Sequence, residues 1–367
     1  MAAMATNPDF STLDQVLKTR YDNSDAPGAA IIIARGDTIL YERYMGVADM
    51  QTGEKIGPDT RLNIASISKQ FTVMALLQQA ERHDPALLDR PVSDFFDYPQ
   101  SWWHDITLRN LANHTSGVPD TRPRTDRQWC VMADEEQSIA YFKDVEKPIF
   151  TPGEYYDYLN PSFILLAKVV EKMSGQDFYE YVRDNIFQPA GMTSTYYFDR
   201  TANPRRQAHA YMPDGDGWRE YDFGEETFFA TRPDGGIYST ARDMLRWENA
   251  LFNGKIVSPA NLSAACTPSV SVTDSPYCDY QRRPNTSYGL GLFIEATAAV
   301  DNPVDNYVNT PVNNNPFKIY HTGDNGGFQA YVATYPANSL RVIILENRAD
   351  RSRDALVSTI DTLINSL

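Results

Sequence analysis

Ser66 and Lys69 stand directly before the apolar run 71–77, and this juxtaposition constrains the fold more than any other feature of the chain. The run predicts a buried helix. Residues three apart share one face of a helix, so the two side chains should meet at its N-terminal end, where the helix dipole favours an ionised hydroxyl. A serine one turn from a proton acceptor is the arrangement of a nucleophile. The alternative is an N-cap serine followed by a solvated lysine.

Composition excludes several classes of protein. The 367 residues, 42% of them hydrophobic, suffice for one large domain or two ordinary ones, each with its own core. A formal net charge of −15 without a basic cluster argues against binding nucleic acid. No segment reaches 18 uninterrupted apolar residues, so no membrane span is expected. The first residues lack a signal-peptide pattern, which predicts a cytoplasmic protein as the chain is written, or a periplasmic or secreted one if a leader was removed.

Cysteine and histidine patterns point away from a metal. Cys130, Cys266 and Cys278 are an odd number without C-x-x-C spacing, so free thiols are expected. The five histidines are scattered without the spacing of metal ligands. We expect neither a metal nor a cofactor.

The order of the expected elements indicates an α/β architecture. Helices are expected at 13–21, from about 239 and at 353–367, with strands at 29–34, 38–44, 288–294, 317–322, 328–335 and 340–346. Helices near both ends would then bracket one antiparallel sheet. The segment 80–230 is rich in helical patterns and tryptophan, which predicts an inserted helical lobe. We therefore expect an α/β lobe of residues 1–79 plus 231–367 and a mainly helical lobe of residues 80–230, acting as one catalytic unit.

A second candidate element is Tyr158-Leu159-Asn160, which follows a Thr-Pro-Gly turn and precedes a helix starting at Pro161. Tyr158 has a fixed place just before this helix, although aromatic packing is the commoner use of a tyrosine. Asn160 has an equally good structural interpretation as the cap of the helix, with Gly175 as its stop.

The third element is His321-Thr322-Gly323, at the end of an expected strand and before Asp324. A glycine here would let a substrate lie along the strand edge, where backbone N–H groups could stabilise an oxyanion. As a lone tripeptide it would be a turn.

In order and character, the three elements together resemble the S-x-x-K, Y-x-N and K-T-G or H-x-G motifs of serine β-lactamases and penicillin-binding-protein-like hydrolases. The resemblance is to the class C branch, with its D,D-carboxypeptidases, D-aminopeptidases and family VIII esterases. It covers nearly the whole chain, because the segments 58–61, 111–119, 151–153, 235–243 and 288–291 also match. It implies the two-lobe α/β (α+β) β-lactamase/transpeptidase-like fold.

The resemblance also implies roles. Ser66 would be the acylated nucleophile, Lys69 would lower its proton affinity, and Tyr158 would act as general base and then activate the deacylating water. Asn160 would orient the substrate or Lys69, and the backbone N–H groups of Ser66 and Asp324 would form the oxyanion hole. Whether Lys69 or Tyr158 takes the proton stays open, since a phenol of pKa about 10 needs cationic neighbours to act near neutrality.

His321 stands where β-lactamases have lysine. The resemblance implies that His321 is a catalytic residue and that Thr322 and Gly323 bind the substrate. A histidine is mostly neutral at pH 7, so a substrate carboxylate loses its partner and efficient β-lactam turnover is not expected. We expect hydrolysis of a small ester, amide or peptide, as an esterase or a D-amino-acid amidase or peptidase. The alternatives are a β-lactamase or D-alanyl-D-alanine carboxypeptidase, and a non-catalytic penicillin-binding-like protein. The natural substrate, a transferase outcome and the oligomeric state stay open.

Two further expectations follow from the resemblance. His114 lies in a loop that supports the cleft and is expected to be structural. Four tryptophans of the helical lobe are expected either to line an aromatic acyl pocket or to pack in the core: Trp102, Trp103, Trp129 and Trp218.

Overall fold

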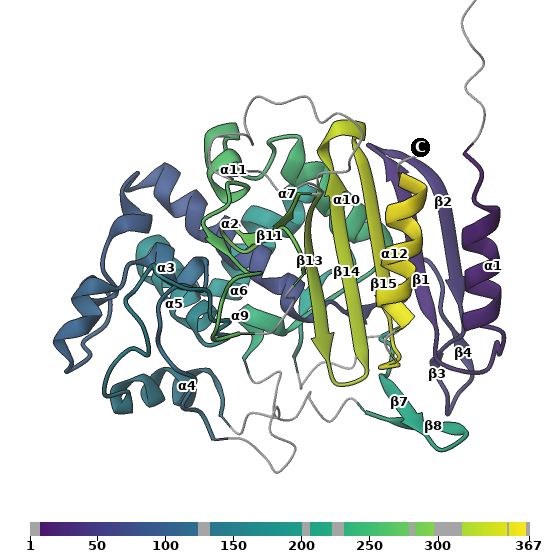
Figure 1. Cartoon of the computed structure of the whole chain (residues 1–367), viewed down its shortest axis with the longest axis horizontal. Coiled ribbons are helices and arrows are strands. Elements are labelled where there is room, and N and C mark those ends of the chain that lie inside the picture. Colours follow the sequence, from purple (N-terminus) through teal and green to yellow (C-terminus); the bar gives the residue numbers. More distant parts are fainter. Residues whose placement is uncertain are drawn as a thin grey trace, which may run out of the picture.

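The computed structural model describes residues 8–123, 133–199, 206–221, 231–278, 283–296, 318–350 and 352–364. Within these residues, the largest sheet has eight antiparallel strands in the order β10-β11-β12-β13-β14-β15-β1-β2 (Figure 1). Its strands are β1 (Ala29–Arg35), β2 (Thr38–Met45), β10 (Val270–Ser271), β11 (Thr286–Tyr288), β12 (Phe293–Glu295), β13 (Lys318–Asn325), β14 (Phe328–Tyr335) and β15 (Leu340–Glu346).

Three small sheets and a set of helices complete the described part of the chain. The small sheets contain β3 (Val47–Asp49) with β4 (Glu54–Lys55), β5 (Leu62–Asn63) with β9 (Ile237–Ser239) and β6 (Tyr196–Tyr197), and β7 (Tyr211–Asp214) with β8 (Gly217–Glu220). The helices are α1 (Ser11–Arg20), α2 (Ser68–Arg82), α3 (Leu108–Ala112), α4 (Glu135–Tyr141), α5 (Ser162–Ser174), α6 (Phe178–Val182), α7 (Gln188–Ala190), α9 (Arg232–Gly235), α10 (Ala241–Phe252), α11 (Pro259–Ala265) and α12 (Ser352–Ile364). None of the described helices has the length and apolar character needed to cross a membrane.

Both faces of the large sheet are covered, which explains why its central strands are apolar almost without interruption. In β1, Ala30 and Ile32 belong to one core, whereas Ile31 and Ile33 belong to the other. Successive side chains of a strand point to opposite faces, so a strand buried on both sides has no polar positions. The first core contains α2 and the helices around it, and the second contains α1 and α12 (Figure 1). The expected antiparallel sheet, bracketed by N- and C-terminal helices, is confirmed.

Helix α2 passes through the first core and is buried from its first residue to Ala80. Phe71 stacks on Trp247 of α10, with ring centroids 4.1 Å apart. The Trp247 indole N–H in turn donates to the side-chain oxygen of Gln70, at 2.8 Å, so a buried polar group of the helix is satisfied. The apolar run 71–77 therefore forms the buried helix that it predicts.

The expected strand 288–294 is wrong in one respect: it is two strands, β11 and β12, joined by a tight turn. Gly291 has a φ of +69°, which favours glycine. A Cβ added at Gly289 would overlap the carbonyl oxygen of Ala265. The apolar pattern continues through these glycines, so periodicity alone could not reveal the turn.

Of the helices between residues 80 and 230, α3, α4 and α5 lie on the left of Figure 1, on the side away from α1 and α12. The boundaries of the two lobes, 1–79 plus 231–367 and 80–230, stay a prediction.

Gly323 allows β13 to cross the backbone that leads into α2. A Cβ at this position would overlap the Ile64 carbonyl oxygen and lie 3.0 Å from its carbonyl carbon. We expect Gly323→Ala to lower the free energy of unfolding by about 1–3 kcal/mol, because two backbones would have to separate. Chemical denaturation measures the change. The control is Gly57→Ala, where the added Cβ meets nothing within 4 Å. Equal denaturation midpoints for the two variants would contradict this account of Gly323.

Candidate active site

Ser66 lies in a short 3-10 turn, Ala65–Ile67, that leads directly into α2 at Ser68. Ala65 has a φ of +46°, a left-handed conformation that costs a non-glycine residue roughly 1–2 kcal/mol. The side-chain oxygen of Asn63 accepts a hydrogen bond from the Ala65 N–H, at 2.7 Å, and helps to hold this bend. The bend directs Ser66, whose side chain is almost enclosed, toward the start of α2.

Lys69, in the first turn of α2, is fully buried beside Ser66. Its Nζ lies 3.1 Å from Ser66 Oγ and donates to the main-chain carbonyl of Asp234, at 2.8 Å. One turn further along α2, the Thr72 hydroxyl donates to the carbonyl of Pro233, at 2.7 Å. Two side chains of α2 therefore hold α9 close to Ser66.

Burial governs the charges at this point. Burial, with a smaller effect of Arg122, lowers the pKa of Lys69 to about 7, against the opposing attraction of the Asp234 carboxylate. Burial also raises the pKa of Asp234, against the attraction of Lys69. Both groups are thus shifted toward their neutral forms, and a neutral amine beside Ser66 is a proton acceptor.

This environment predicts a pH dependence. If Lys69 accepts the Ser66 proton, kcat/KM for an ester without titrating groups should rise with pH through about 7 and then level off, because only the neutral amine accepts a proton. Initial rates between about pH 5.5 and 9 at constant ionic strength would measure the profile. A rate that falls as pH rises through 7 would instead show that the enzyme works with Lys69 protonated. Tyr158 would then be the group that accepts the Ser66 proton.

Tyr158 lies in the loop before α5, with its ring facing Lys69. The Lys69 Nζ is 4.9 Å from the centroid of this ring and 5.4 Å from that of Phe163. In its protonated form, Lys69 would supply the cationic neighbour that a working phenol at this position needs.

Asn160 does not cap α5 through its side chain. Its main-chain carbonyl accepts from the Phe163 N–H, at 3.1 Å, whereas its side-chain oxygen is buried without a hydrogen-bond partner. Pro161 is the N-cap residue, without a side-chain cap, and Gly175 ends the helix with a φ of +71°. The cap interpretation of the Asn160 side chain is therefore wrong, and its oxygen stays available to a ligand.

The third motif lies in β13, with its residues alternating between the two faces of the sheet. Gly323 packs against the Ile64 backbone, so the space that a side chain would need at this position is filled by the main chain of Ile64. Asp324 lies on the other face, where its carboxylate accepts from Arg353 of α12, at 2.8 Å. Thr322 shares this face by the alternation of the strand. Any contact of Thr322 or Asp324 with a substrate near Ser66 would therefore come from the backbone.

His321 is buried and both its ring nitrogens are engaged. Nε2 lies 3.1 Å from the Tyr288 hydroxyl, and Nδ1 lies 2.6 Å from the Thr322 carbonyl. Burial, with Lys69 nearby, lowers the pKa of His321 to about 3, so its ring is neutral. The geometry makes His321 a neutral wall of the site and does not offer it as an exposed acid, base or carboxylate partner.

Three residues that contact Lys69 or His321, or act on the charge of Lys69, were not among the catalytic candidates: Asp234, Arg122 and Tyr288. Arg122 is buried in a two-bond ion pair with Asp120, and its Nη1 has no hydrogen-bond partner. In the sequence, only the position of Asp234 before Gly235-Gly236 could have indicated that it belongs to the site. Tertiary packing brings it to Lys69 from 165 residues away.

The tryptophans do not form an aromatic acyl pocket in the described residues. Trp103 is fully buried and stacks on Tyr98, with centroids 4.6 Å apart. Trp102 packs against Trp103, and Trp218 lies on β8 under Arg348. Trp129 and Cys130 lie outside the described residues, whereas Cys266 is a free thiol.

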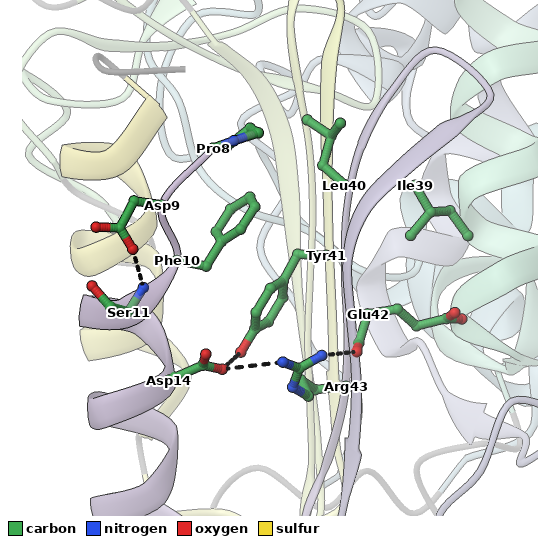
Figure 2. A pocket seen from close by; sticks show the side chains of 10 residues that line it. All are labelled: Pro8, Asp9, Phe10, Ser11, Asp14, Ile39, Leu40, Tyr41, Glu42 and Arg43. Carbon is green, nitrogen blue, oxygen red and sulfur yellow. Dashed lines mark hydrogen bonds and ion pairs between the residues drawn. The ribbon is translucent and has the colours of Figure 1, made fainter. Parts of the chain in front are cut away.

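A hollow between α1 and β2 lies apart from this centre. Figure 2 shows its lining residues, among them Tyr41, which donates to Asp14, and Arg43, whose guanidinium is 3.5 Å from the same carboxylate. None of the candidate catalytic residues lines it. Within the described part of the chain, no group of three or more histidine, cysteine or acidic side chains is placed to hold a metal ion.

A broad antiparallel sheet between two layers of helices, with a serine and a buried lysine at the start of the central helix, defines the β-lactamase/transpeptidase-like class of folds. The family model described as Beta-lactamase matches residues 13–363, and the chain belongs to this family. Both the family resemblance and the fold expected from the motifs are confirmed.

Known relatives agree with this assignment. Penicillin-binding protein 4* of Bacillus subtilis (strain 168) is 28% identical over 268 residues, covering 68% of this chain and 57% of the relative. A D-aminopeptidase of Brucella anthropi is 29% identical over 199 residues, covering 53% and 37%. The crystal structure of a penicillin binding protein from Bacillus halodurans superimposes with a TM-score of 0.74 at 27% identity, covering 95% of this chain and 98% of the other. The alignments span about half the length of the curated relatives, or less.

Proposed function

We propose that this chain is a serine hydrolase that cleaves small amides and esters through an acyl-enzyme, with amides or short peptides of D-amino acids as its leading substrates. The observation that carries the proposal is the 3.1 Å contact between Ser66 Oγ and a buried Lys69 whose pKa is lowered to about 7. An amine near neutrality at this distance can take the serine proton when the hydroxyl attacks a carbonyl carbon.

The steps follow from the arrangement. Ser66 Oγ adds to the substrate carbonyl, its proton passes to Lys69 or Tyr158, and the backbone N–H groups of Ser66 and Asp324 receive the oxyanion. The tetrahedral intermediate expels the amine or alcohol, which takes the proton, and leaves an acyl ester on Ser66. Water, activated by Tyr158, then hydrolyses the ester. The buried oxygen of Asn160 is free to orient the acyl group.

The substrate class rests on the third motif and on one relative. A neutral, hydrogen-bonded His321 offers no cation to the carboxylate of a β-lactam. The D-aminopeptidase similarity supports amides of D-amino acids. One observation favours a second candidate, a D-alanyl-D-alanine carboxypeptidase: the buried guanidinium of Arg122 keeps one nitrogen without a partner and could bind a carboxylate.

The test compares four substrates: p-nitrophenyl butyrate, D-alanine p-nitroanilide, its L-enantiomer and an N-acylated D-alanyl-D-alanine peptide, with Ser66→Ala as control. Release from the ester and the D-anilide, together with an acyl adduct in the intact mass, would support the proposal. Release of D-alanine from the peptide alone would favour the carboxypeptidase. No turnover and no adduct with any substrate would favour the non-catalytic alternative.

A further inference from the structure

His114 holds the loop that carries Tyr158 at three places. The main-chain carbonyl of His114 accepts from the Asp157 N–H, at 2.8 Å, and its Nδ1 accepts from the Leu159 N–H, at 3.0 Å. Its ring packs against that of Tyr158 in a tilted arrangement, with centroids 4.1 Å apart and an angle of 31° between the planes. Both residues that flank Tyr158, and the Tyr158 ring itself, are thus fixed by one side chain and its carbonyl.

The conformation of His114 is itself held in place by its neighbours. Its φ of +60° lies in the left-handed region, which histidine enters more readily than most residues but still at a cost. The next residue, Thr115, donates from its hydroxyl to the side chain of Asn113, at 2.6 Å, and accepts from Asn110 of α3, at 3.0 Å. A rigid support therefore connects α3 to His114 and on to Tyr158.

The ring of His114 must be neutral to do this. Nδ1 accepts a hydrogen bond, which places the ring proton on Nε2. Burial, together with Lys69 and His321, lowers the pKa of His114 well below its usual range. The buried Nε2 has no hydrogen-bond partner, a cost of about 1–3 kcal/mol. His114 thus combines two local costs, a left-handed backbone and an unpartnered donor.

We propose that His114 is the positioning residue of Tyr158, holding its ring against Lys69, which contacts Ser66, so that the phenol can take part in proton transfer. The inference rests on the proposed function, because it assumes that Tyr158 moves a proton. It goes further than the expectation that His114 merely supports the loop: the imidazole acts through Tyr158 and has no catalytic effect without it.

A double-mutant cycle separates this role from general support of the fold. His114→Ala should lower kcat for p-nitrophenyl butyrate by about 10–100-fold while KM changes by less than about twofold. In a Tyr158→Phe background, the same substitution should cost less than about threefold, because there is no hydroxyl left to position. His114→Asn, whose side-chain oxygen can accept from the Leu159 N–H, should restore part of kcat. Exposed His104, replaced by alanine, is the matched control.

Equal losses from His114→Ala in both backgrounds would overturn the proposal, as would an unchanged kcat. The rate at which a fluorophosphonate labels Ser66, followed by intact mass, compares the same variants without requiring substrate turnover. If the unsubstituted protein is not labelled and turns over no substrate, the proposed function fails. If it is labelled and His114→Ala is labelled equally fast, the positioning role alone fails.

Discussion

Replacing Ser66 with alanine should lower kcat for any accepted ester or amide by roughly 10⁴-fold or more, because no acyl-enzyme can form. The fold should survive: the Ser66 hydroxyl contacts Lys69, and Lys69 keeps its bond to the Asp234 carbonyl when the hydroxyl is lost. Nitrophenol release and the intact mass would show the loss of turnover and of the acyl adduct. The denaturation midpoint should stay close to that of the unsubstituted protein.

The matched control removes a second hydroxyl in the same turn of the chain. Ser68 is buried, and its Oγ accepts from the Ile237 N–H, at 3.2 Å. Ser68→Ala should cost about 1–3 kcal/mol of stability, because that N–H loses its partner, while the acyl adduct still forms. An adduct that persists in Ser66→Ala but not in Ser68→Ala would exclude Ser66 as the nucleophile.

The second large effect is expected for Lys69→Met, which keeps much of the side-chain volume and removes the amine. We expect kcat to fall by about 10³-fold or more, since Ser66 loses its nearest proton acceptor. Steady-state rates for p-nitrophenyl butyrate would measure it. Activity within about tenfold of the unsubstituted protein would rule out Lys69 as an essential proton acceptor.

Stability should respond to the same substitution in a pH-dependent way. Burial raises the pKa of Asp234 above its unfolded value, and in Lys69→Met no lysine opposes this shift. A carboxyl whose folded pKa is raised contributes stability at low pH and loses it as pH rises through the folded pKa. Lys69→Met should therefore be close to the unsubstituted protein near pH 5 and fall progressively below it toward pH 8, as thermal unfolding would show. A difference that shrinks with rising pH would contradict the assigned role of Asp234.

Local features of the chain could be predicted well from the sequence. Helix α2 and the strands β1, β2, β14 and β15 follow from apolar runs and turn residues that act over a few positions. The contact between Ser66 and Lys69 follows from helical spacing alone. Tyr158 could be placed near them only through the resemblance, because no local rule connects position 158 to position 69.

What escaped prediction depends on packing between distant segments. Asp234 reaches Lys69 through its main chain, which no side-chain motif encodes. The glycine of the third motif makes room for the Ile64 backbone, where a substrate had been expected. The sequence identifies His321 as a histidine, but its neutral state depends on burial and on the nearby charge of Lys69.

The pairing of β1 with β15 has a consequence for the order in which the molecule can form. Residues 29–35 pair with residues 340–346, so the centre of the sheet cannot close until β15 has been synthesised. The surroundings of Ser66 depend equally on late segments, because Gly323 packs against Ile64, two residues before Ser66. Contacts this distant in sequence slow folding and leave partly folded chains exposed to aggregation. A nascent chain that already contains Ser66, Lys69 and Tyr158 should therefore have no activity until the C-terminal strands have been synthesised and have joined the sheet.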